Sequence, residues 1–175
     1  MGNAKGTVLI GPAKYLRTRK EESRKILPEE LHHYLEERVS PASWYPESDA
    51  IALIRALMQL MPGQEDEVLE GFGVVTAREL GNGVYSHLVK DGASAGSTFA
   101  LWASMHDTGE LTVDFEDTHK MVFRLVGYDH TSREMCAIIG SYLQETIRMG
   151  GRNASMEDIA CTLSGEPACS WRATW

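Results

Sequence analysis

The sequence predicts an α+β fold in which a four-stranded antiparallel sheet, made of two hairpins, has helices packed on one face. Apolar residues recur at helical spacing through the first part of the chain. Two neighbouring segments, 109–117 and 119–128, then alternate apolar and polar residues, and a second pair of expected strands, 156–163 and 168–175, comes later. Because one helix separates the two hairpins, we expect a single sheet with the helices as the second layer.

Each expected helix carries an apolar stripe and is bounded by residues that cap or break helices. Ser48 or Asp49 can cap the second of them, and Pro62-Gly63 ends it. The helices expected before the first hairpin lie at 28–39, 48–61, 65–80, 84–90 and 93–105.

A longer helix is expected between the two hairpins, over 131–149, because Thr131 or Ser132 can cap it and Gly150-Gly151 ends it. No internal repeat or long linker divides the chain. We therefore expect an N-terminal arm or helix over 1–27, followed by a single α+β domain over 28–175.

The amino-acid composition argues against several classes of function. The net charge of −8 argues against a general nucleic-acid binder, which shows a basic excess. No apolar stretch approaches the roughly 20 residues that span a bilayer, so we expect no membrane span and a cytoplasmic location. Three cysteines, an odd number, do not form the disulfide framework of a secreted domain.

The cysteines are the most informative residues of the C-terminal part. Cys161 and Cys169 each lie four residues from Gly165, so a hairpin that turns there sets them opposite each other. Cys136 lies in the first turns of the preceding helix, and the three sulfurs can therefore meet where the helix packs on the sheet. Spacing alone leaves two interpretations open, since free cysteines are also common core residues.

A zinc site would need a fourth ligand, and two acidic residues are candidates. Strand alternation favours Glu157, which shares a face with Cys161. Asp158 would reach the same face only if the strand began irregularly.

Three motifs then suggest a family. The segments "CAIIGSYL" (136–143), "DIAC" (158–161) and "GEPACSW" (165–171) resemble the 4-vinyl reductase domain family, clearly over about 131–173. That family is related to a group of ligand-binding folds that includes subunits of the TRAPP complex. The resemblance implies an antiparallel sheet with helices packed against it, and a homodimer.

The resemblance also implies a metal site. In regulators that carry such a domain, three cysteines and a glutamate hold zinc. Residue by residue, this places a structural zinc on Cys136, Cys161 and Cys169, with Asp158 at the position of the glutamate. Asp158 departs from the pattern because its side chain is one methylene shorter.

A ligand pocket is the other implication, because the family binds small molecules between its central helices and its sheet. The residues in the corresponding segments suit a small hydrophobic or aromatic ligand, although each also fits an ordinary core or surface role. Heme is not expected, because the Tyr-x-Ser-x-Arg motif of the heme-based nitric-oxide sensors is absent. The candidate pocket residues are His87, Trp102, His106, Phe115 and Phe123.

These observations favour a non-enzymatic module that binds a small molecule and regulates a partner protein. No nucleotide-binding fingerprint and no nucleophile motif occurs in the sequence. The alternative is a dimeric interaction or scaffold protein that uses the same fold without a ligand. A cavity between helices and sheet would favour the first hypothesis, and a filled core with an exposed apolar patch the second.

Overall fold

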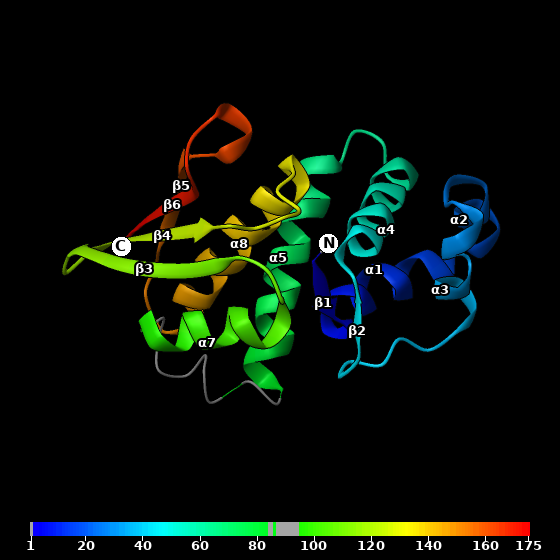
Figure 1. Ribbon diagram of the computed structural model, residues 1–175, viewed down its shortest axis with the longest axis horizontal. Helices are drawn as coiled ribbons and strands as arrows, with labels where there is room; N and C mark the ends of the chain where they lie inside the picture. Colours follow the sequence, from blue (N-terminus) through cyan, green and yellow to red (C-terminus); the bar gives the residue numbers. More distant parts are fainter. Residues whose placement is uncertain (1, 84–85, 87–94) are drawn as a thin grey trace.

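The computed structural model describes the chain except residues 1, 84–85 and 87–94 (Figure 1). Helices α1 to α4 gather at one end of the molecule, the sheet with α7 and α8 forms the other end, and α5 lies between them. The elements of the first end are β1 (Asn3–Lys5), α1 (Gly6–Thr18), α2 (Lys20–Ile26), a 3-10 turn (Glu29–Leu31), α3 (His33–Glu36), β2 (Trp44–Pro46), α4 (Glu47–Leu60) and α5 (Glu65–Asn82).

The helical end has its own apolar core. Helices α1 and α4 pack against each other, and the small strands β1 and β2 pair antiparallel beside them. Fully buried leucines of both helices fill this core, among them Leu9, Leu16 and Leu53.

The second end contains α7 (Ala95–Met105), β3 (Glu110–Asp117), β4 (Lys120–Val126), α8 (Arg133–Met149), β5 (Ser155–Ala160) and β6 (Cys169–Thr174). The four strands form one antiparallel sheet in the order β3-β4-β6-β5, so the two hairpins lie side by side as expected. Phe123 and Trp171 are opposite each other in this sheet and are buried in the core that also holds Leu143 of α8.

Helix α8 connects the two ends through its packing on α5. Ser132 caps α8, as expected, by accepting a hydrogen bond from the backbone N–H of Met135. The axes can approach closely because Gly73 of α5 faces Ser141: a Cβ atom added at Gly73 would lie 2.0 Å from the Ser141 Oγ atom. This helix crossing therefore requires glycine, which has no Cβ atom, at position 73.

One expected helix differs from the structure. The helix predicted over 28–39 is a 3-10 turn and the four-residue helix α3, because the chain becomes extended at Glu37. The side chain of Arg17 fixes this early end by donating hydrogen bonds to the carbonyl oxygens of Tyr34 and Glu37. The helix predicted over 84–90 lies almost wholly outside the described residues.

The strand predicted over 156–163 ends at Ala160 and contains an irregularity between Asp158 and Ala160. One extra residue reverses the alternation of side chains beyond it. Ile159, at the irregularity, and Leu163, in the 3-10 turn Thr162–Ser164 after the strand, are both exposed.

No helix in the described part of the chain is long and apolar enough to cross a membrane.

Candidate functional site

A small apolar cavity lies mainly between α5, α7 and α8, and α1 and α4 each add one residue to its wall. Its volume is about 50 Å³. Apolar side chains form most of the wall, and the few polar groups include the imidazole of His106. The lining residues are Val8, Ile54, Phe72, Thr76, Trp102, Met105, His106, Met135, Ile138, Ile139 and Tyr142.

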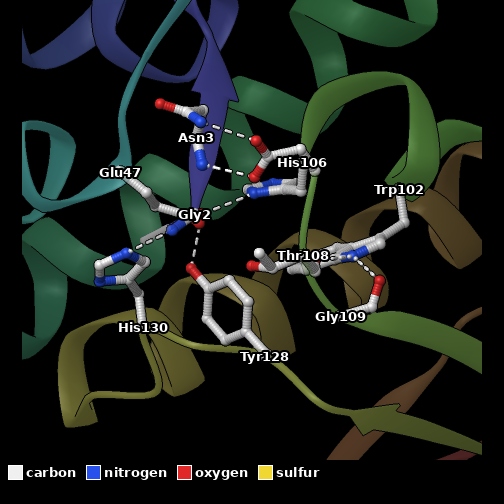
Figure 2. A network of polar contacts seen from close by, with 10 residues as sticks. Gly2, Asn3, Glu47, Trp102, His106, Thr108, Gly109, Tyr128 and His130 are labelled. Atoms are coloured by element: carbon white, nitrogen blue, oxygen red, sulfur yellow. Dashed lines mark hydrogen bonds and ion pairs between the residues drawn. The ribbon is translucent and has the colours of Figure 1, made fainter.

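Two stacked rings form one wall of the cavity. The indole of Trp102 lies almost parallel to the imidazole of His106, with 4.0 Å between the ring centroids and 12° between the planes. The indole N–H donates to the carbonyl oxygens of Thr108 and Gly109, both at 3.1 Å, and this fixes the ring (Figure 2). Because Trp102 is held in this way, it holds His106 in turn.

A buried carboxylate lies beside these rings. Oε1 of Glu47 accepts hydrogen bonds from Nδ1 of His106 and from the hydroxyl of Tyr128, both at 2.6 Å (Figure 2). Glu47 is fully buried, and its Oε2 atom has no hydrogen-bond partner among the described residues. Burial, reinforced by the Glu47 carboxylate, raises the pKa of Tyr128, so the phenol stays protonated and acts as a donor.

The N-terminal strand β1 covers this group. The backbone N–H of Glu47 donates to the carbonyl of Gly2, and the N–H of Gly2 donates to Nε2 of His130. The carboxylate of Asp107 accepts hydrogen bonds from Asn3, and these lower its pKa. The group thus joins β1, the start of α4, the α7–β3 connection and the β4–α8 connection.

A second cluster consists of the three cysteines. The Sγ atoms of Cys136, Cys161 and Cys169 lie 3.8 Å from one another in every pair. Burial raises the pKa of Cys136, and the neighbouring thiols add to this. Burial also acts to raise the pKa of Cys169, but hydrogen bonds from Thr162 and the other thiols outweigh it, so its pKa is lowered.

The acidic candidates lie apart from the sulfurs. Among the described residues, the metal-ligand grouping at this place contains the three cysteines and no carboxylate. Glu157, which strand alternation favoured, faces away and pairs with Arg172 at 3.6 Å. Asp158 pairs with Trp171, lies on the side of the sheet that faces Gly140 of α8, and has a pKa that burial raises.

The structure separates the five candidate pocket residues. Trp102 and His106 line the cavity, whereas Phe123 is fully buried within the core next to the sheet. Phe115 is 55% exposed near the far end of the edge strand β3, and His87 lies outside the described residues. Phe115 is therefore not among the residues that line this cavity.

Glu47 and Tyr128 were not among the candidates. Glu47 follows Pro46 at the start of a helix, where an acidic residue is ordinary. Its partners His106 and Tyr128 are 59 and 81 residues away in the sequence. No local pattern could have connected the three.

Comparison with known proteins identifies the fold of the chain. No protein-family model and no curated protein matches the chain. An H-NOX protein from S. oneidensis, solved in an Fe(II)NO state, matches with a TM-score of 0.69 and 13% identity, over 97% of each chain. An Fe(II) H-NOX protein variant from K. algicida matches with a TM-score of 0.68 and 12% identity, over 97% of this chain and 95% of that one.

The chain therefore has the H-NOX fold. This corrects the family suggested by the cysteine motifs: the matching structures are H-NOX domains, and neither 4-vinyl reductase domains nor TRAPP subunits. The zinc prediction is wrong as well. The matching structures are described by iron or heme states, and here three thiols converge where a structural zinc takes four ligands.

The described residues around this cavity do not fit a heme. Pockets for organic ligands enclose about 300–1,000 Å³, and this cavity encloses about 50 Å³. Among the described lining residues, none is a lysine or arginine that could meet the two propionates of a heme. His106, the histidine of the described wall, is bonded to Glu47 and covered on one ring face by Trp102.

Proposed function

We propose that this chain, an H-NOX fold in which the described wall of the central cavity does not fit a heme, is a sensor module that binds a small apolar molecule in that cavity. The observation that carries the proposal is the contact between the cavity and a buried polar group. The Trp102–His106 stack is the cavity wall on one side and the partner of Glu47 on the other. A molecule in the cavity therefore touches the residues that join four segments of the chain.

The size and lining of the cavity set the ligand class. An apolar cavity of about 150 Å³ stays dry and admits benzene or xenon. The cavity here, at about 50 Å³, has room for a smaller apolar molecule, and a single aromatic ring needs the wall to move. Met105 and Met135 belong to that wall, and methionine side chains adapt readily to a new occupant.

Ligand binding acts on the structure through His106. A ligand that displaces the Trp102–His106 stack changes the hydrogen bond from His106 to Glu47, the first residue of α4. Glu47 also holds Tyr128, which precedes α8. A ligand shifts the equilibrium only if it binds one arrangement better than the other. The altered surface is then recognised by a partner protein, and the module itself carries out no chemistry.

The test is a titration of the purified protein, followed by NMR of its methionine methyl groups. With benzene or xenon as the probe, we expect saturable shifts of the Met105 and Met135 methyl signals. Thr76→Leu narrows the cavity from α5 and should weaken these shifts, whereas Val75→Leu, on the exposed side of the same helix, should leave them unchanged.

A parallel titration with hemin distinguishes the alternative that the fold comparison raises. A sharp Soret band that saturates at one heme per chain would replace the proposal with a heme-based sensor. The proposal would also be overturned if neither benzene nor xenon shifted the methyl signals of Met105 and Met135.

A further inference from the structure

The cysteine cluster is independent of the cavity and has a coordination geometry of its own. Three separate segments supply the sulfurs: Cys136 comes from the first turns of α8, Cys161 follows β5, and Cys169 begins β6. They are all the cysteines of the chain, and all three are free thiols. Cys136 and Cys161 are half-buried, so solutes can reach the group.

The spacing of the sulfurs suits a single central atom. With 3.8 Å between each pair, an atom on the axis of the three sulfurs lies at least about 2.2 Å from each, which leaves room for bonds such as the roughly 2.3 Å of zinc–thiolate. Within the described parts of the chain, no histidine or carboxylate completes a fourth position. The geometry is that of a three-coordinate site made of sulfur alone.

The net charge of the complex indicates which kind of atom three thiolates bind best at this place. The hydrogen-bond contacts of these sulfurs, within the described residues, are with one another and with Thr162. A monovalent or divalent metal on three thiolates leaves negative charge in a half-buried place, which is costly without a cationic partner. A trivalent atom bound to three thiolates forms a complex with no net charge.

We propose that Cys136, Cys161 and Cys169 form a binding site for trivalent arsenic, taken up as arsenous acid. Three S–H bonds and three As–O bonds break, three As–S bonds form, and three water molecules leave. No electron is transferred, because arsenic stays trivalent and sulfur stays at the thiol level. The product is neutral, as the site requires.

Arsenic in this site would tie α8 to the β5–β6 hairpin. The connection between the two strands, residues 161–168, otherwise packs loosely: Leu163 is 59% exposed. A ligand that binds only the folded chain raises its stability. We therefore expect the melting temperature to rise with arsenite concentration and to level off at one equivalent.

The experiment is an anaerobic titration of the reduced protein with sodium arsenite, followed by native mass spectrometry and thiol counting. The expected species carries one arsenic atom per chain, has lost three hydrogens and has no titratable thiol. Cys136→Ser and Cys161→Ser should each lower the affinity by at least about tenfold, as disturbing a metal site commonly does. Ser164→Ala, in the same connection but without a thiol, should bind like the original chain.

Three results would overturn the site. One is a complex in which a thiol remains titratable; another is a cysteine variant that binds arsenite as tightly as the original chain. The third is displacement of arsenic by equimolar zinc or monovalent copper. The numbers of bound arsenic atoms and of titratable thiols in the unaltered protein test the site even if a serine variant fails to fold.

Discussion

Nδ1 of His106 lies 2.6 Å from Oε1 of Glu47, and both side chains are almost completely buried, at 5% and 0% exposure. A carboxylate in such a place is stable only if it is hydrogen-bonded, and His106 and Tyr128 both supply bonds. The pair joins the start of α4 to the end of α7, two helices of different ends of the molecule. One buried carboxylate therefore joins the two ends of the molecule at this place.

Replacing this carboxylate tests its structural role. Glu47→Ala leaves the imidazole and the phenol without their acceptor, and we expect a loss of about 3–5 kcal/mol in the free energy of unfolding. Glu47→Gln keeps the shape and one acceptor oxygen, so a smaller loss of about 1–3 kcal/mol is expected. Urea unfolding followed by circular dichroism measures both. Glu67→Gln, on the exposed side of α5, is the control and should change stability by less than about 0.5 kcal/mol.

The crossing of α5 and α8 depends on one glycine. A Cβ atom at position 73 would lie 2.4 Å from the carbonyl oxygen of Ile138, which is backbone and cannot turn aside. Gly73→Ala should therefore destabilise the fold by about 1–3 kcal/mol or more, as overpacking does. Gly71→Ala, in the same helix with nothing within 4 Å, should stabilise it by about 0.5–1 kcal/mol. Equal melting temperatures of the two variants would contradict this account of the crossing.

Acid should weaken the contact between α4 and α8. The hydrogen bond from Arg55 lowers the pKa of Glu134 to about 2, against the opposing effect of burial and with help from Ser132. Since the unfolded value is about 4.3, the pair stabilises the fold fully above that pH and loses its contribution as pH falls towards 2. The pair is partly exposed, so the gain is at most about 1 kcal/mol. Stability curves of the original chain and Glu134→Gln, measured against pH, should differ at neutral pH and converge near pH 2.

Trp102 should prove to be a positioning residue for His106. Trp102→Phe removes the indole N–H, and the carbonyl oxygens of Thr108 and Gly109 each lose a donor. We expect a loss of about 1–3 kcal/mol in stability, together with a changed chemical shift of the His106 ring protons because the stacked indole is gone. An unchanged imidazole signal would show that the stack does not fix the ring.

Much of the fold could be predicted from local patterns. Alternating residues at 109–117 and 119–128 predicted the first hairpin, and the helices at 48–61, 65–80 and 131–149 appear as α4, α5 and α8. These patterns are local because one face of each element is buried, and burial selects apolar side chains at the period of the element. The four-stranded sheet followed from the order of the elements.

The family assignment could not be made in this way. The cysteine motifs cover a short part of the chain, and they indicated a different family from the one whose fold the whole chain shares. A backbone fold tolerates extensive change in sequence as long as apolar positions keep their pattern. At 12–13% identity, only the arrangement of all elements in space identified the H-NOX fold.

The sequence by itself determined the two hairpins, the main helices and the approach of three cysteines, because each depends on periods and turns of a few residues. Only the tertiary structure decided that Glu47, His106 and Tyr128 meet, since nothing local connects residues so far apart in the chain. It also decided that Asp158 faces α8 while Glu157 pairs with Arg172, because the irregularity between Asp158 and Ala160 reverses the alternation between these two residues and Cys161.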